Sequence, residues 1–176
     1  MGKRDSKSLA QVIHELGRYP LEAFDFLKEA LDYTVHHVHG EPAPAWKRIV
    51  DWMHQHDISP EDLTRRCRSR KLPCEIAKAL QMIGGIEGLD SRHVSGPQLC
   101  LGLRELALKK WGFLASDVLR HWNIVTTRDV GEMVFALIDA DLLQRRSDDS
   151  IEDFDDQYDF DEAFDRAYRI PVAAGA

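Results

Sequence analysis

This sequence has no long apolar run and no paired cysteines. No apolar stretch approaches the ~20 residues that a membrane-spanning helix needs. The basic residues at its start are followed by no apolar segment of the kind that a secretion signal contains. The three cysteines form no Cys-x-x-Cys pair, which argues against a disulfide framework and against a structural zinc site. We therefore expect a cytoplasmic protein with reduced thiols and no membrane contact.

Catalytic signatures are also absent from the sequence. It contains no Gly-x-Ser-x-Gly nucleophile motif, no phosphate-binding loop, no dinucleotide-binding glycine pattern and no kinase signature. The composition, with 44% hydrophobic and 30% charged residues, is that of an ordinary globular protein. A chain of 176 residues is long enough to bury a core without a metal or disulfide. These features favour a non-enzymatic protein, for which we expect no cofactor.

Apolar residues recur at helical spacing along most of the chain, so we expect a mainly α-helical fold. A stripe that begins after Pro20 predicts a helix over 20–39, ended by Gly40. The prolines of 41–44 then predict a linker, and three short helical patterns follow it. The expected organisation is a helical core domain, an inserted three-helix module and a flexible C-terminus, over 1–40 with 92–170, 41–91 and 171–176 respectively.

The second half of the core domain has the helix order of a winged-helix unit between Ser95 and Arg145. Three helical patterns are followed by Leu142-Leu143, which predicts a short strand, and Ile124-Val125 predicts another before the third helix. That third helix carries three acidic residues against one arginine, which is the wrong sign for contact with DNA. We therefore expect a winged-helix-like unit that contacts protein.

Several short motifs occur in an order that resembles a small bacterial protein family. They are His93-Val94-Ser95-Gly96, Gly102-Leu103-Arg104-Glu105-Leu106-Ala107, Trp122-Asn123-Ile124, Thr127-Arg128-Asp129-Val130-Gly131-Glu132-Met133-Val134-Phe135 and Tyr158-Asp159-Phe160. The family occurs in the planctomycete and verrucomicrobial group and has no established activity, so the resemblance implies a shared fold for about 1–40 and 92–170. The module 41–91 is a departure from it, and Asn123 and Asp141 stand where family members often carry glycine.

Residues 147–165 form an acidic tail, which we treat as one segment. It holds ten Asp/Glu and no Lys or Arg, whereas the rest of the chain has 23 basic and 20 acidic residues. Aromatic rings alternate with these acids, and rings spaced in this way need a groove, either in this chain or in a partner. The candidate partner-binding residues are Phe154, Tyr158, Phe160 and Phe164.

A second charged segment, the basic cluster, has five positive charges in seven residues: Arg65, Arg66, Arg68, Arg70 and Lys71. The helical patterns on either side of it resemble a helix-turn-helix, which would place the helix after Pro73 in the major groove. That helix offers no Arg, Asn or Gln in its first turn for reading bases, and Glu75 would oppose the phosphates. The cluster is a candidate contact to a phosphate backbone, or else a solvated surface patch.

A third candidate is a set of metal ligands near the end of the helix over 20–39. Asp32, His36 and His39 are spaced at i, i+4 and i+7 and so share one helical face. Carboxylate and imidazole groups are the ligands of divalent transition metals. The competing interpretation is a polar helix face with histidines at its C-terminal end, where the helix dipole favours positive charge.

From the sequence we expect first a protein-interaction or adaptor protein, with the acidic tail and the inserted module as contact surfaces. The alternatives are a nucleic-acid-associated regulator that uses the basic cluster and a metal-dependent enzyme. A protein partner is therefore the first expectation and a nucleic acid the second, while the sequence leaves the oligomeric state open.

Overall fold

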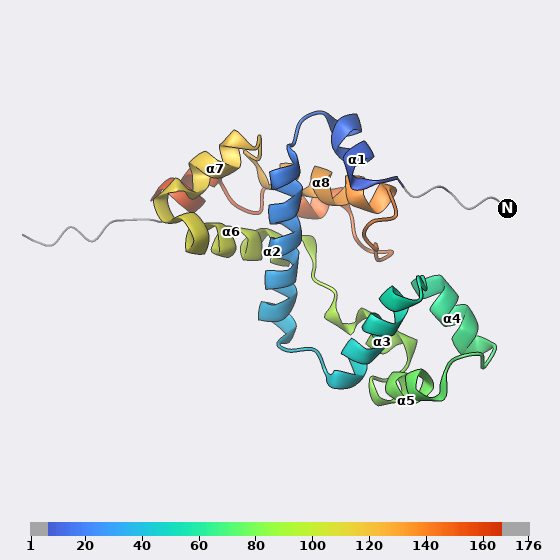
Figure 1. Ribbon diagram of the computed structural model, residues 1–176. Helices are drawn as coiled ribbons and strands as arrows, with labels where there is room; N and C mark the ends of the chain where they lie inside the picture. Colours follow the sequence, from blue (N-terminus) through green and yellow to red (C-terminus); the bar gives the residue numbers. More distant parts are fainter. Residues whose placement is uncertain (1–6, 167–176) are drawn as a thin grey trace, which may run out of the picture. The chain divides into compact units, whose positions relative to one another are not determined.

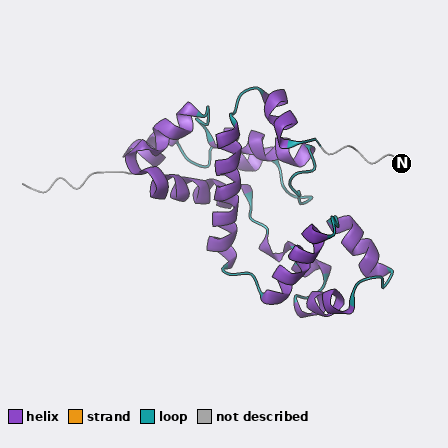
Figure 2. Cartoon of the chain, viewed as in Figure 1, coloured by secondary structure: helices purple, strands orange, loops and turns teal. Residues whose placement is uncertain are grey.

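The structure is a computed structural model that describes residues 7–166, and all regular secondary structure in this range is helical (Figures 1 and 2). The expectation of a mainly α-helical fold is confirmed. No helix in the described range is both long and apolar enough to cross a membrane.

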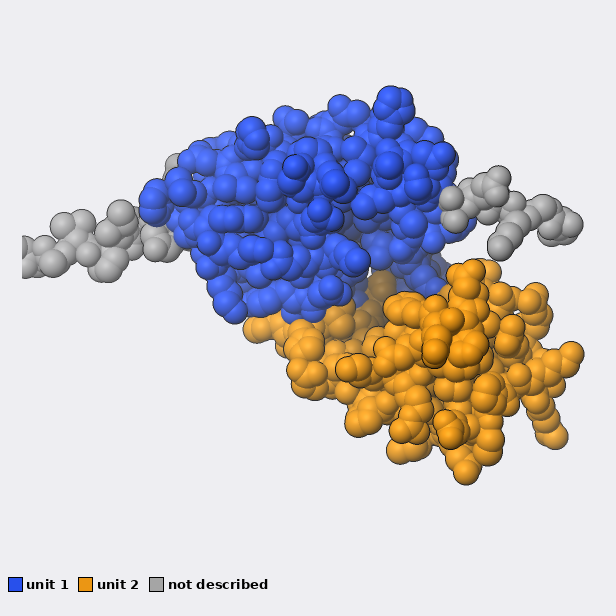
Figure 3. Space-filling view, viewed as in Figure 1, with its two compact units in different colours: residues 1–34, 94–176 blue, residues 35–93 orange. Residues whose placement is uncertain are grey.

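The chain divides into two compact units, drawn in different colours in Figure 3. Unit 1 consists of residues 1–34 and 94–176, and unit 2 of residues 35–93. The sequence placed the insertion at 41–91, so unit 2 also takes in the last turn of the preceding helix and two residues of the return segment. The expected flexible C-terminus, 171–176, lies outside the described residues.

Unit 1 is a helical body in which most boundaries follow local sequence signals. Its helices are α1 (Leu9–Leu16), α2 (Leu21–His39, whose last turn belongs to unit 2), α6 (Gly96–Trp111), α7 (Ala115–His121) and α8 (Thr127–Asp139), followed by the short helices η4 (Ile151–Phe154) and η5 (Asp161–Arg166). The side chains of Ser95 and Thr126 cap α6 and α8, and each accepts a hydrogen bond from the backbone N–H three residues later. Gly112 ends α6.

The core of unit 1 forms where α2 meets α6. A Cβ atom at Gly102 would lie 1.9 Å from the Oγ1 atom of Thr34, so glycine is required at this close approach. The buried Thr34 hydroxyl donates to the Ala30 carbonyl oxygen at 2.6 Å, which satisfies its hydrogen bonding. Phe26 of α2 packs against Trp111 at the end of α6, with ring centroids 4.7 Å apart. The two helices therefore share one apolar core, to which α1, α7, α8 and the acidic tail also contribute.

Unit 2 has its own small core, built from three helices. They are α3 (Pro44–Gln55), α4 (Pro60–Arg68) and α5 (Cys74–Met82). Helix α3 packs against α5, and Ile49, Leu63 and Leu80 are among the buried residues between the three. Only Leu63 of α4 is buried, so most of that helix faces solvent.

The first and last residues of unit 2 are held together by Arg92 and His39. The Arg92 guanidinium donates to the carbonyl oxygens of His39 and Gly40, which cap the C-terminal end of α2. The Nε2 atom of His39 in turn donates to the His93 carbonyl oxygen at 2.8 Å. The Arg92 guanidinium also lies over the Trp46 ring, 5.5 Å from its centroid. These contacts join the segment that enters unit 2 to the segment that leaves it.

The two expected strands are not formed, since no strand occurs anywhere between residues 7 and 166. Ile124 is buried in a turn in which its N–H donates to the Leu119 carbonyl oxygen at 2.9 Å. The N–H of Leu142 donates to the Leu137 carbonyl oxygen at 2.9 Å. Both turns follow a residue with positive φ, 61° at Asn123 and 57° at Asp141. These helix ends satisfy the backbone groups locally, so no second strand is needed to pair with them.

Candidate functional site

The basic cluster begins on α4, a helix that the sequence positions by its first turn. Ser59 caps it by accepting a hydrogen bond from the Asp62 N–H at 3.1 Å, and Pro60 occupies the first helical position. Leu63 anchors the helix in the core of unit 2 and is fully buried. The remaining side chains of α4 are half-buried or exposed, so its arginines lie on the surface.

The end of α4 places an arginine where glycine is usually found. The N–H of Arg70 donates to the Cys67 carbonyl oxygen at 3.1 Å, and the N–H of Lys71 donates to the Arg66 carbonyl oxygen at 2.9 Å. These two bonds form a Schellman cap, whose central residue adopts the left-handed conformation that glycine adopts without strain. Arg70 has a φ of 54°. The chain therefore carries a long cationic side chain at a position where backbone conformation favours glycine.

The side chains of the basic cluster are largely uncompensated. Arg66 is half-buried, and the others, Arg65, Arg68, Arg70 and Lys71, are exposed. Arg65 forms an ion pair with Asp62 three residues earlier. Within the described residues, the other four make no ion pair or side-chain hydrogen bond. Four positive charges at the end of one short helix are thus available to a partner.

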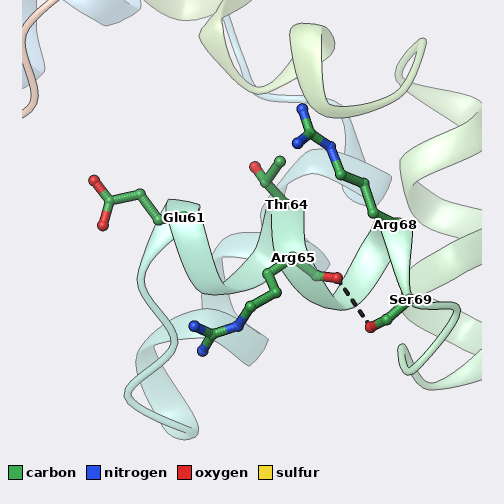
Figure 4. A pocket seen from close by; sticks show the side chains of 5 residues that line it. All are labelled: Glu61, Thr64, Arg65, Arg68 and Ser69. Carbon is green, nitrogen blue, oxygen red and sulfur yellow. Dashed lines mark hydrogen bonds between the residues drawn. The ribbon is translucent and has the colours of Figure 1, made fainter. Parts of the chain in front are cut away.

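A shallow hollow lies along α4 and includes two of these arginines (Figure 4). Five residues with charged or hydroxyl side chains line it: Glu61, Thr64, Arg65, Arg68 and Ser69. The Thr64 hydroxyl donates to the Pro60 carbonyl oxygen at 2.8 Å, and the Ser69 hydroxyl donates to the Arg65 carbonyl oxygen at 2.9 Å. The guanidinium groups of Arg65 and Arg68 extend from the helix in different directions (Figure 4). The hollow therefore presents charge without an enclosed cavity or a nucleophile.

The packing of unit 2 differs from the helix-turn-helix that the sequence suggested. Helix α5 packs chiefly against α3 rather than against the α4 that precedes it. In the first turn of α5, Cys74 and Glu75 are exposed and Ile76 is buried in the core. This turn offers no Arg, Asn or Gln for contact with a base edge. Contact with a nucleic acid would therefore come from the basic cluster and not from α5.

The aromatic residues of the acidic tail are not available to a partner. Phe154, Phe160 and Phe164 are only 4%, 6% and 1% exposed, and the half-buried Tyr158 packs with them in the core of unit 1. A Cβ atom at Gly131 would lie 2.8 Å from the Phe154 ring, so this ring sits directly on α8. The groove that these rings need is in this chain, which corrects their assignment as partner-binding residues.

The acids of the same tail are partly neutralised by arginines of unit 1. Arg128 pairs with Asp155 at 2.6 Å, and Arg120 pairs with Asp161 at 2.5 Å. The pKa of Arg128 is raised, first by its hydrogen bonds to Asp155 and then by the charge of that carboxylate. The acidic tail is therefore held on unit 1 by charge as well as by apolar packing.

The proposed metal ligands do not form a metal site. The described residues contain no group of three or more His, Cys, Asp or Glu side chains that could hold an ion. The helix separates Asp32 from His39 by about 10 Å along its axis, too far for one ion. His39 donates to the His93 carbonyl oxygen, and the Nε2 atom of His36 lies 2.6 Å from a Glu41 carboxylate oxygen. The two histidines have structural partners of their own.

The most extensive buried polar network lies in unit 1, around Asp129, and the sequence analysis did not identify it. Asp129 accepts hydrogen bonds from the Tyr19 hydroxyl at 2.9 Å and from the Val125 and Thr126 N–H groups at 2.9 and 2.8 Å, and Arg18 forms an ion pair with it at 2.7 Å. Burial, together with hydrogen bonds to Glu132 and Asp129, raises the pKa of Tyr19 far above its usual value. The capping pattern from Thr126 to Asp129 was the available signal. Every Asp129 oxygen has a partner, so this network fixes the start of α8 against Arg18 and Tyr19.

The cysteines also offer no reactive centre. Cys100 is fully buried, and burial raises the pKa of its thiol to about 12. Such a thiol is protonated and inert at neutral pH. Cys67 and Cys74 are exposed free cysteines in unit 2. No acid, base or second thiol is placed beside either of them by a hydrogen bond in the described part of the chain.

The basic cluster is therefore the candidate site that the described residues best support, because the acidic-tail aromatics and the histidines are occupied by contacts within the chain. No protein-family model, curated protein or solved structure matches this chain.

Proposed function

We propose that this chain is a non-enzymatic binding protein, and that unit 2 uses the basic cluster to bind an anionic macromolecule. The observation that carries this proposal is the set of four exposed or half-buried cations without ion-pair partners in the described residues. Like charges so close together repel one another, and they contribute nothing to the core of unit 2, where α4 is represented by Leu63 alone. Binding to an anion gives these charges a role.

The distribution of charge supports unit 2 as the binding part. Unit 2 has nine Lys/Arg and eight Asp/Glu, which leaves 14 Lys/Arg and 22 Asp/Glu in unit 1. The net charge is therefore +1 for unit 2 and −8 for unit 1. An anion is repelled by unit 1 as a whole and attracted locally to the basic cluster.

For unit 1 we propose a scaffold role. The order of α6, α7 and α8 supports a winged-helix-like arrangement of helices, although the described residues contain no strands for a wing. The exposed or half-buried acids of α8, such as Glu132 and Asp139, oppose contact with phosphates. We further propose that the bacterial family resembled by this sequence shares the fold of unit 1. Several motif residues support this, because Gly102, Gly131 and Asp129 make close packing or buried hydrogen bonds.

Affinity purification of the tagged full-length protein from its native cells tests the proposed function. The wild type is compared with a variant in which Arg66, Arg68, Arg70 and Lys71 are all replaced by Gln. Lys47→Gln/Arg48→Gln is a control that removes exposed charge from α3 of the same unit. We expect an anionic partner, whether protein or nucleic acid, to copurify with the wild type and the control and to be lost from the quadruple variant. A partner retained by the quadruple variant would refute the proposal.

A further inference from the structure

We infer that the anionic partner is a double-stranded nucleic acid, whose phosphate backbone is bound by the basic cluster without reading of the bases. The inference rests on the proposed function and names the partner of the same surface. Duplex DNA carries one negative charge per roughly 1.7 Å of its axis. Arg66, Arg68, Arg70 and Lys71 place four cations without ion-pair partners in the described residues at the end of α4 and in the turn after it, so several of them can contact closely spaced phosphates at once.

The conformation of Arg70 is an independent observation for a ligand. Its φ of 54° places it in the left-handed region, where residues other than glycine are strained. The Arg70 side chain is exposed and has no ion-pair or hydrogen-bond partner in the described residues that would offset this strain. The Schellman cap holds the backbone of Arg70 in this conformation but gives its side chain no partner, so the guanidinium group is available to a ligand. A guanidinium group can donate two hydrogen bonds at once to a phosphate, which glycine in the same turn cannot do.

The surroundings of the basic cluster favour phosphates over bases. The hollow along α4 is lined by polar side chains, and its hydroxyl groups on Thr64 and Ser69 are hydrogen-bonded to backbone carbonyl oxygens. The first turn of α5 has no Arg, Asn or Gln for contact with a base edge, and its exposed Glu75 would oppose the phosphates. We therefore expect equal affinity for duplexes of unrelated sequence, since phosphate contacts carry no sequence information.

The same surface is less suited to binding single-stranded nucleic acid. Binding of single strands usually combines cations with aromatic rings on which bases stack. Unit 2, which is described in full, has two tryptophans, both half-buried, and Trp52 packs against its core. The Trp46 indole N–H donates to the Leu89 carbonyl oxygen at 3.4 Å, and the Trp52 ring lies 5.2 Å from the His56 ring. Neither ring belongs to the hollow along α4 that Arg65 and Arg68 line.

The test is a titration of the full-length protein into a labelled 20-base-pair duplex, followed by fluorescence anisotropy at several salt concentrations. Arg65 is paired with Asp62, so four cations remain to displace counterions. Each neutralised phosphate contributes a slope of about −0.9 to a plot of log affinity against log salt. We expect a slope of about −3.6, which corresponds to a roughly 150-fold loss of affinity between 50 and 200 mM salt. Two duplexes of unrelated sequence should give the same result.

Two glycine variants separate the loss of binding from any effect on folding. Arg70→Gly relieves the left-handed strain and removes one phosphate contact, so we expect a more stable protein whose salt slope is smaller in magnitude by about 0.9. Asp57→Gly is the matched control, because Asp57 is also in unit 2 and has a φ of 50°. The control should be stabilised in the same way and should keep the full slope.

The outcomes distinguish this inference from the proposed function. If the duplex binds with the expected slope and the quadruple Gln variant does not bind, the inference is supported. If single strands bind more tightly than the duplex, or if polyglutamate binds as tightly as the duplex, the duplex inference is overturned while the anion-binding function stands. If neither duplex nor polyglutamate binds, and no partner copurifies from cells through the basic cluster, both fail.

Discussion

Replacing Phe154 with Ala tests whether the acidic tail belongs to the core of unit 1. The Phe154 ring is 4% exposed and lies against Gly96 of α6 and Gly131 of α8. No side chain at either glycine can move into the space that the ring would leave. We therefore expect Phe154→Ala to cost about 3–5 kcal/mol, the range for removing a buried phenylalanine whose cavity does not collapse.

Urea unfolding of the full-length protein, followed by circular dichroism, measures this loss. With a denaturant dependence of about 2 kcal/mol per molar, the midpoint should fall by about 2 M. Phe113→Ala is the control, because the Phe113 side chain is 61% exposed. The control should change stability by no more than about 0.5 kcal/mol. A loss below about 1 kcal/mol for Phe154→Ala would refute the packing of the tail and would restore its aromatics as candidate contacts for a partner.

Three further predictions concern single residues. The pKa of Tyr19 is raised in the folded state, so the stability that its hydroxyl provides is complete below pH 10 and is lost as the pH rises above 10. The free energy of unfolding, measured at pH 9 and pH 11, should therefore fall less in Tyr19→Phe than in the wild type. A thiol reagent should titrate two cysteines in the native protein and the third, Cys100, only after unfolding, and rapid labelling of all three would contradict its burial. Arg70→Gly and Asp57→Gly should each raise the free energy of unfolding by about 0.5–1 kcal/mol, and a decrease for Arg70→Gly would mean that its side chain stabilises the fold.

Local signals in the sequence were sufficient to place most helices. The helix predicted over 20–39 is observed as α2 (Leu21–His39), and Gly40 follows it with a φ of 67°. Ser95 and Thr126 cap α6 and α8 through contacts that are local in sequence, because capping depends on side chains and backbone groups only a few residues apart. The three helical patterns of the insertion are likewise observed as α3, α4 and α5.

Features that depend on distant parts of the chain were not predictable in the same way. β-Branched residues at Ile124-Val125 favour a strand, but a strand requires a pairing partner, and the local turn satisfies the Ile124 backbone instead. The spacing of the tail aromatics shows that they need a groove but does not show which molecule supplies it. Tyr19 and Asp129 are 110 residues apart in the sequence, so the residues around one do not reveal that it is hydrogen-bonded to the other.

The candidate site likewise combines features that the sequence shows with features that only the fold shows. The basic cluster is visible in the sequence as a run of charge. The fold alone shows that four of its five cations have no ion pair within the described residues and that Arg70 is left-handed. The histidine candidates failed for the opposite reason. A shared helix face is necessary for metal binding, yet His36 and His39 contact Glu41 and the His93 carbonyl oxygen instead of a common ion.

The most direct test of the central claim is a map of where the partner binds. Amide chemical shifts of the ¹⁵N-labelled full-length protein are recorded as a 20-base-pair duplex is added in low salt. We predict that the largest changes fall on residues 64–71, around the hollow along α4 and the turn that follows it. Changes confined to unit 1, or no changes at duplex concentrations that saturate the anisotropy signal, would contradict binding through the basic cluster.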